Sequence, residues 1–149
     1  MRFAAPLLAL TCLVANAQTS ERTQAERIVQ KAIAYARQDG MDKLILQTNL
    51  PHGIFHVGSG SDLYLFVYDL KGVAKANGFQ SELVGTSRWD VKDAKGLYQV
   101  REFIKVARTK GRGWVDYHFV NPITRKVEPK ATYVEAHEGF VFCCGSYRN

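Results

Sequence analysis

Cysteine is scarce in this sequence, with three among 149 residues. No Cys-x-x-Cys pair occurs, so thioredoxin-like redox chemistry and thiolate zinc sites have no support. Proline and glycine are also few, at 4 and 12 residues, which excludes fibrous and low-complexity chains. The 46% of hydrophobic residues and 23% of charged residues are instead typical of one small globular domain.

Several catalytic motifs are missing as well. No Gly-x-Ser-x-Gly elbow, phosphate-binding loop or His-Glu-x-x-His pair occurs, so hydrolase and nucleotide-binding functions have no starting point. His52 and His56 have the i, i+4 spacing of a helical metal site, but Pro51 and Gly53 indicate a loop there. No carboxylate stands ready as a third ligand. We therefore predict no catalytic residue, no metal and no cofactor.

Long apolar runs are absent too, because none approaches the ~20 residues of a membrane-spanning helix. The first 17 residues match a signal peptide: Arg2 gives a positive start, residues 4–14 are mostly apolar, and Ala15-Asn16-Ala17 is a small-x-small cleavage pattern. We predict a signal peptide at residues 1–17, a single domain at residues 18–149, and export to the periplasm or the outside of the cell.

Cleavage would leave Cys143 and Cys144 as the only cysteines. Adjacent cysteines can form a strained vicinal disulfide, pair with another chain or stay reduced. On a strand their side chains point to opposite faces, which favours one buried thiol and one that is exposed or under a helix. A thiol-dependent redox or electron-transfer accessory protein that uses this pair is the alternative function.

Hydrophobic periodicity predicts the order of the elements. Apolar residues at three- and four-residue steps predict a long helix over 20–39 and a connecting helix around 100–110, with a short helix at 41–48. Apolar runs bounded by turn residues predict five strands, at 63–68, 73–77, 113–120, 127–136 and 140–147. Hairpin-length connections join antiparallel neighbours, so we predict an α+β fold with a five-stranded antiparallel sheet.

Basic residues give the chain a net charge of +6 and gather around the connecting helix, at Arg101, Lys105, Arg108, Lys110 and Arg112. Such a segment can bind phosphates. An exported protein rarely meets nucleic acid, however, and we predict no nucleic-acid partner. The same positive field attracts any small anion.

Short motifs follow one another in a fixed order along residues 64–147. They are Tyr64-Leu65-Phe66-Val67-Tyr68-Asp69-Leu70-x-Gly72, Leu83-Val84-Gly85, Lys92-Asp93-x-x-Gly96, Gly111-x-Gly113-Trp114-Val115-Asp116-Tyr117, Asn121-Pro122, Lys130-x-x-Tyr133 and Gly145-x-Tyr147. Together they resemble the single Cache domain of the second type (sCache type 2), and the resemblance covers nearly all of residues 18–149.

This resemblance implies a PAS-like sheet with a long N-terminal helix. Members usually form the extracytoplasmic sensor of chemoreceptors and histidine kinases, and they bind small molecules, often short carboxylates such as acetate, propionate, pyruvate or lactate. The present chain looks like a freestanding, exported version that does not span a membrane. The implied function is therefore sensor-type binding of a small organic anion, together with a membrane receptor or another periplasmic protein as partner.

Five residues are candidates to bind the anion. Lys130 and the hydroxyls of Tyr117 and Tyr133 can donate to a buried carboxylate, while Trp114 excludes water. Asn77 stands where the family often has the histidine of Ala-His-Pro, and its amide can still donate.

Two structural questions stay open at this point. Strict alternation sends Lys130 and Tyr133 to opposite faces of a strand, so both line one pocket only if a bulge intervenes near Pro129. The aromatic candidates are also compatible with a plain core, which would make the protein a structural partner with a collapsed pocket.

Overall fold

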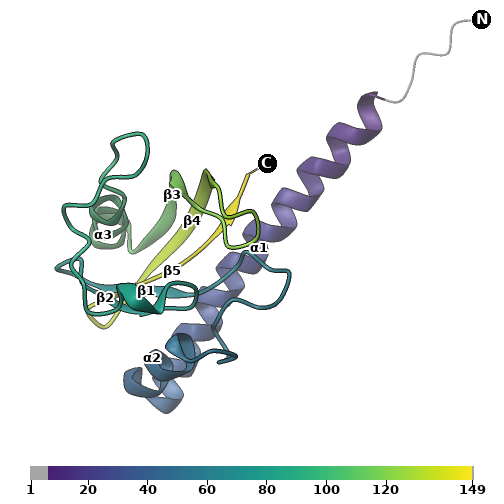
Figure 1. The fold of residues 1–149 in the computed structure, drawn as a ribbon. Coiled ribbons are helices and arrows are strands. Elements are labelled where there is room, and N and C mark those ends of the chain that lie inside the picture. Colours follow the sequence, from purple (N-terminus) through teal and green to yellow (C-terminus); the bar gives the residue numbers. More distant parts are fainter. Residues whose placement is uncertain (1–6, 149) are drawn as a thin grey trace, which may run out of the picture.

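The structure is a computed structural model that describes the backbone of residues 7–148 and the side chains of residues 20–148. The elements follow in the order α1 (Leu7–Asp39), α2 (Met41–Asn49), β1 (Phe66–Asp69), β2 (Ala74–Asn77), the 3-10 helix η1 (Ser81–Leu83), α3 (Gln99–Lys110), β3 (Arg112–Val120), β4 (Val127–His137) and β5 (Phe140–Tyr147). Figure 1 shows them wrapped around one curved sheet, with α1 reaching beyond its edge.

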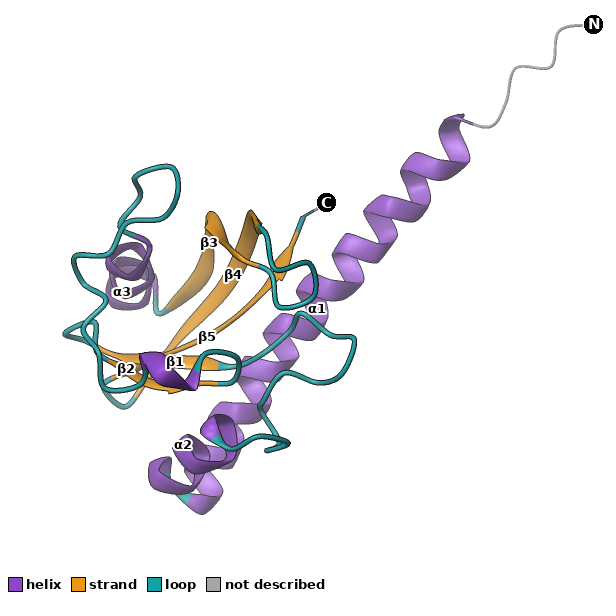
Figure 2. Cartoon of the chain, viewed as in Figure 1, coloured by secondary structure: helices purple, strands orange, loops and turns teal. Residues whose placement is uncertain are grey.

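The five strands form one sheet in the order β2-β1-β5-β4-β3, and every neighbouring pair is antiparallel. Figure 2 shows this sheet with α1 and α3 beside it. The predicted α+β class and five-stranded antiparallel sheet are confirmed. The central position of β5 buries both of its faces, since all its residues from Val141 to Tyr147 are buried.

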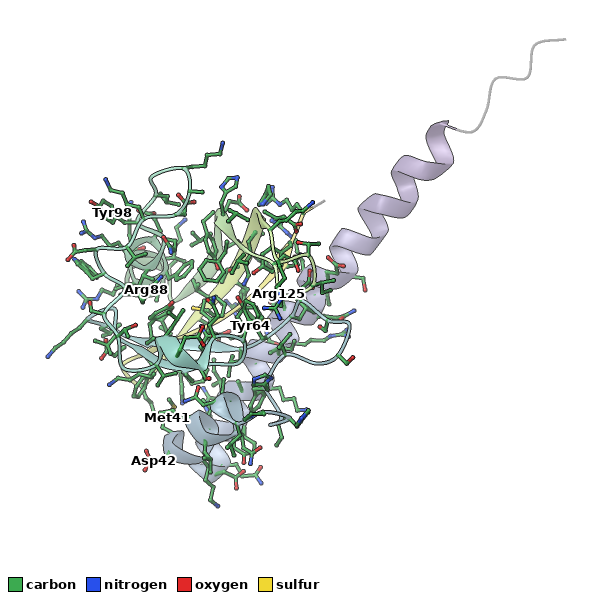
Figure 3. The ribbon with its side chains drawn as sticks, in the orientation of Figure 1. Met41, Asp42, Tyr64, Arg88, Tyr98 and Arg125 are labelled. Atoms are coloured by element: carbon green, nitrogen blue, oxygen red, sulfur yellow. The ribbon has the colours of Figure 1, made fainter. Side chains whose placement is uncertain are left out.

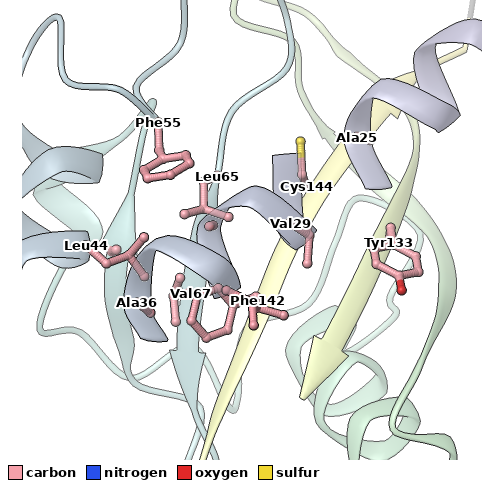
Figure 4. Packing of buried hydrophobic residues seen from close by; sticks show 13 residues of the cluster. Ala25, Val29, Ala36, Leu44, Phe55, Leu65, Val67, Tyr133, Phe142 and Cys144 are labelled. Atoms are coloured by element: carbon pink, nitrogen blue, oxygen red, sulfur yellow. The ribbon is translucent and has the colours of Figure 1, made fainter. Parts of the chain in front are cut away.

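One face of the sheet is covered by α1. Its buried stripe repeats at three- and four-residue steps and consists of Ala25, Val29, Ala32, Ile33 and Ala36. Figure 4 shows part of this stripe packed on Leu65, Val67 and Phe142. The small side chains let the helix backbone approach the sheet closely, and the strand residues fill the space between them.

The other face of the sheet is covered by α3. The helix buries Val100, Phe103, Ile104 and Ala107 against side chains of the strands. It ends at Gly111, whose φ of 77° lies in the left-handed region that favours glycine, and whose N–H bonds to the carbonyl of Ala107. The two faces therefore carry two separate hydrophobic clusters.

Two element boundaries differ from prediction. The first strand begins at Phe66 because the backbone of Leu65 pairs with Phe55 and Gly78 in the preceding and following loops. The long helix begins at Leu7, ahead of the predicted residue 20. The predicted signal peptide lies partly in α1 and partly outside the described residues, and its cleavage stays a prediction.

Candidate functional site

A small cavity lies between the sheet and α3. It is lined by Tyr64, Phe66, Tyr68, Asn77, Gln99, Phe103, Tyr117 and Phe119. Its free volume is about 10 Å³, which is space for about one water molecule. Figure 3 shows the side chains of the domain, with Tyr64 in its interior and Tyr98 near the start of α3. Most of the lining is aromatic, and the polar groups come from a few positions.

Lys130 of β4 borders this cavity through Tyr64. Its side chain is 1% exposed, and its Nζ donates to the Tyr64 hydroxyl at 2.9 Å. Four rings surround the Nζ, with centroids at 4.2 Å (Tyr64), 4.7 Å (Tyr147), 5.0 Å (Phe66) and 5.6 Å (Phe119). Among the described residues, no carboxylate lies within 4.0 Å of this amine. A buried lysine without a counter-ion is costly unless a ligand supplies one.

The hydroxyl groups beside Lys130 form a chain with a fixed direction. Tyr147 donates to the backbone carbonyl of Val120 at 2.6 Å, so its hydrogen is already used. The 3.4 Å contact between the hydroxyls of Tyr64 and Tyr147 must then have Tyr64 as donor. The Tyr64 oxygen accepts from Lys130, and this gives the amine one acceptor for as many as three hydrogens.

Burial sets the protonation of the groups around the cavity. It lowers the pKa of Lys130 to about 7, against the opposing effects of Cys144, Asp62 and Cys143. Burial likewise raises the pKa of the hydroxyls of Tyr64 and Tyr117 well above the usual range. The tyrosines are therefore neutral hydrogen-bonding groups, whereas burial brings the pKa of Lys130 close to neutral pH.

Two side-chain amides also face the cavity. The Asn77 oxygen accepts from the backbone N–H groups of Phe79 and Gln80 at 2.9 and 2.8 Å, which leaves its NH₂ group as the available donor. Gln99, 4% exposed at the start of α3, has a buried Oε1 with no hydrogen-bond partner among the described residues. An unpaired buried acceptor is destabilising, so this atom is a place where a ligand donor would be favourable.

The predicted site residues divide between the two faces of the sheet. Lys130, Tyr117 and Asn77 lie on the α3 face at or beside the cavity. Trp114 and Tyr133 lie on the α1 face and pack on each other with ring centroids 5.5 Å apart. Figure 4 shows Tyr133 within the cluster under α1.

No bulge brings the two faces together. The pairing of β4 with β3 and β5 runs without interruption from Lys130 to Glu135, so alternation holds and Lys130 and Tyr133 cannot line one pocket. On the α1 face Tyr133 instead donates to the Glu135 carboxylate at 2.7 Å. Trp114 lies under the guanidinium of Arg22, 4.7 Å away, and so helps to dock α1.

Three further residues at or beside the cavity, Tyr64, Tyr147 and Gln99, were not among the candidates predicted from the sequence. Tyr64 and Tyr147 were visible within the motifs, but an apolar run and a terminal motif do not distinguish a ligand hydroxyl from a core aromatic. Gln99 had no signal at all, because a glutamine at a helix start is usually solvated. Only the structure distinguishes it, because its side chain is buried and its Oε1 accepts no hydrogen bond from the described residues.

The adjacent cysteines are both fully buried and belong to different clusters, with Cys143 on the α3 face and Cys144 on the α1 face. Burial raises the pKa of both thiols, for Cys144 to about 12. Reactive thiols have the opposite properties, since they are accessible and have a lowered pKa. The geometry thus gives the thiol-dependent alternative no support.

The remaining predictions on sites concern metals and membranes. His52 and His56 lie in the loop after α2, and His52 has a φ of 64°. Among the described side chains, those of residues 20–148, no group of three metal-binding residues occurs. In the same part of the chain, no helix is both long and apolar enough to cross a membrane.

The comparison with protein families settles the class of the domain. The sequence model of the single Cache domain 2 family matches residues 14–149. The chain belongs to this family. The predicted resemblance is confirmed, and single Cache domains are sensor domains like those of chemoreceptors, which bind ligands rather than catalyse reactions.

Solved structures show the same Cache fold. One is a methyl-accepting chemotaxis protein from Vibrio parahaemolyticus RIMD 2210633, with a TM-score of 0.76 at 16% identity over 93% of this chain and 96% of that one. The periplasmic sensor domain of a chemotaxis protein has a TM-score of 0.70 at 23% identity, with 91% and 97% covered. A Cache chemosensory domain described for its carboxylic acid recognition has a TM-score of 0.68 at 17% identity, with 97% and 100% covered.

Proposed function

We propose that this Cache domain is an exported sensor-type protein that binds a short carboxylate in the cavity under α3. The observation that carries the proposal is Lys130, which is fully buried beside the cavity and has no carboxylate of the described chain within 4.0 Å. A ligand carboxylate would supply the missing counter-ion and accept its free N–H groups. The structural neighbour described for carboxylic acid recognition supports this class of ligand.

The ligand must be small, and the site must open to admit it. The free volume of about 10 Å³ is below that of any carboxylate, so the aromatic lining has to move apart on binding. Phe119 and Gln99 also line an open cleft on the outside of the cavity, between β3 and the loop that precedes α3. This cleft also contains Arg88 and Lys92, whose charge attracts anions. It is the entry route in our proposal.

Gln99 refines the class of the ligand. Its unpaired Oε1 lines the same cavity that Lys130 borders, and a hydroxyl next to the carboxylate would donate to it. Sites built to pair a ligand hydroxyl discriminate strongly against analogues without one. A short 2-hydroxy acid such as lactate therefore fits the polar groups better than propionate.

Binding is expected to act by population shift. A ligand that holds Lys130, Tyr64 and Tyr147 in one arrangement favours one packing of the sheet, and α1 lies on the opposite face of the same strands. The exposed side of α1 is then the surface through which a membrane receptor or another periplasmic protein would read the change. Export and this partner are parts of the proposal.

Thermal unfolding with a panel of ligands tests the proposal. Short carboxylates, hydroxy acids and neutral analogues are compared at equal ionic strength, with wild-type protein, Lys130→Met and the exposed-lysine control Lys126→Met. A ligand at 100 times its Kd adds ~2.7 kcal/mol, which raises the Tm by several degrees. We expect this shift in the wild type and in Lys126→Met and its loss in Lys130→Met. No shift with any carboxylate, or an equal shift in all three proteins, would contradict the proposal.

A further inference from the structure

Among the described residues, Lys130 has one hydrogen-bond acceptor and no counter-ion. Because Tyr147 donates to Val120, the hydroxyl chain offers Lys130 a single acceptor, the Tyr64 oxygen at 2.9 Å. An ammonium group has three hydrogens to place, whereas an amine has two and carries no charge. With 1% exposure, solvent does not accept the remaining hydrogens. The geometry of the empty site thus suits the amine better than the ammonium.

Titratable groups face Lys130 from several elements of the fold. From β1 and the segment before it come Tyr64 and the half-buried Asp62, from β3 Tyr117, and from β5 Cys143, Cys144 and Tyr147. Glu128 of β4 acts on Asp62, whose carboxyl has a pKa raised by its own burial. The open cleft outside Lys130 also contains Asp93, Lys95, Asp116, His118 and Arg148. Among these described groups, none forms an ion pair with Lys130.

The four rings around the Nζ act in the opposite sense, because aromatic faces attract a cation within ~6 Å. They do not accept its N–H bonds as water or a carboxylate does. While the cavity is empty, the missing counter-ion disfavours the ammonium form of Lys130. Once a carboxylate has bound, the rings help to stabilise the ammonium. The same site can therefore hold the amine when the cavity is empty and the ammonium when a carboxylate is bound.

We propose that, above neutral pH, Lys130 is an uncharged amine while the cavity is empty and takes up one proton from solvent when a carboxylate binds. This inference rests on the proposed function. The balance is simple: the carboxylate, the amine and one proton give an ion pair, and no other bond forms or breaks. The protein would then respond to the product of carboxylate and proton concentrations rather than to the carboxylate alone.

The sign of the pH dependence follows from the pKa of Lys130 in the empty protein, which is about 7. Below this pH the free protein is already protonated, and affinity is constant. Above it each binding event must take up a proton, so the Kd for a carboxylate rises tenfold per pH unit. A ligand carboxylate next to the ammonium raises the pKa of the bound lysine and keeps it charged.

The first test needs no ligand. In protein labelled with ¹⁵N-lysine, the Nζ chemical shift reports the charge of each lysine as pH is raised. The Lys130 signal is assigned by its absence in Lys130→Met, and the exposed Lys105 is the internal reference. We expect the Lys130 signal to change from ammonium to amine near pH 7. An Nζ that is still ammonium at pH 9 in the free protein would overturn the inference.

The second test measures protons during binding. Lactate is titrated into the full chain by calorimetry at pH 6 and pH 8, in pairs of buffers with different ionisation enthalpies. We expect nearly one proton taken up per lactate at pH 8, nearly none at pH 6, and about tenfold weaker binding at pH 8. Binding at pH 8 with no proton uptake would overturn the inference and leave the proposed function intact. An amine seen by NMR with no binding by any carboxylate would instead overturn the proposed function.

Discussion

Gln99 is a polar side chain at a position where an apolar core residue would ordinarily be expected. It is buried at the first position of α3, and its Oε1 has no partner in the described chain. A protein gains stability by replacing such a group with an apolar one of similar size, because the desolvated acceptor is removed. In the proposed function, this amide is kept because the bound ligand pairs with it.

Replacing Gln99 tests this interpretation. We expect Gln99→Leu to raise the unfolding free energy of the empty protein by about 1 kcal/mol and to remove the preference for lactate over propionate. Gln99→Glu would place a second anion in the cavity and abolish binding of both acids. Urea unfolding and calorimetry measure these effects. A Gln99→Leu protein that is less stable and still prefers lactate would show that the amide has a structural role.

The sequence predicted one site for five residues, but Lys130, Tyr117 and Asn77 lie on the α3 face. Trp114 and Tyr133 lie on the α1 face, for one physical reason. Motif residues three apart on a strand differ in parity, and parity decides the face. The notation Lys130-x-x-Tyr133 already contained this conflict, and the uninterrupted register of β4 settles it. Burial of Gln99 depends on how α3 meets the sheet, which no local pattern contains.

Among the elements, the loop between η1 and α3 depends on Asp93. Its carboxylate accepts from the backbone N–H groups of Lys95 and Leu97 at 2.9 and 2.8 Å, and from that of His118 on β3 at 2.9 Å. One side chain thus closes the loop and attaches it to β3, beside the proposed entry cleft. Burial by itself raises the pKa of Asp93, but these N–H groups and His118 outweigh it and lower the pKa below its usual range.

Asp93→Asn replaces one accepting oxygen by an NH₂ group. We expect a loss of 1–3 kcal/mol in unfolding free energy at pH 7, because a backbone N–H loses its acceptor. The folded-state pKa is depressed, so the wild-type advantage is present above the unfolded pKa of ~3.9 and declines as pH falls through the folded value. Urea unfolding at pH 7 and pH 3 measures this difference.

Asp90→Asn is the matched control for this substitution. Asp90 lies in the same loop, but its side chain is 85% exposed and bonds only to Arg101. We expect a change below ~0.5 kcal/mol there. Equal effects at the two positions, or an Asp93→Asn deficit that does not shrink in acid, would show that Asp93 does not hold the loop.

Element prediction succeeded where periodicity was strong. The bounds of α2, α3 and the last three strands agree with the sequence patterns within about two residues, because amphipathic stripes and turn residues are local features. The first strand was predicted three residues too early, since the sequence cannot show that Leu65 pairs with loops on both sides. The loop before α3 gave no periodic pattern, because hydrogen bonds to Asp93 and to distant backbone groups order it rather than an amphipathic stripe.

For the whole molecule, the charge of Lys130 links stability to pH. Its folded pKa of about 7 lies below the unfolded value of ~10.4. Between these values the unfolded chain binds one more proton, so wild-type stability rises with pH by ~1.4 kcal/mol per unit from this residue. Lys130→Met lacks this contribution and leaves the aromatic surroundings filled by a side chain of similar length.

We therefore expect the unfolding free energy of Lys130→Met minus that of wild type to be largest at or below pH 7. This difference should fall as pH rises toward 10. Chemical denaturation of both proteins at pH 6, 7.5 and 9 gives the slope of this free-energy difference against pH. Other titrating groups are common to the two chains and cancel in the difference. A difference that is constant from pH 6 to pH 9 would mean that Lys130 keeps its proton in the folded state.

The central strand has one further consequence. Along β5, Cys143 belongs to the cavity side and Cys144, its direct neighbour, belongs to the side of α1. The cluster that surrounds the cavity and the cluster under α1 are therefore separated by the thickness of a single sheet, and β5 contributes side chains to both clusters. A displacement of β5 would therefore change the packing on both faces at once, because neighbouring residues of this strand pack in the α3 cluster and in the α1 cluster.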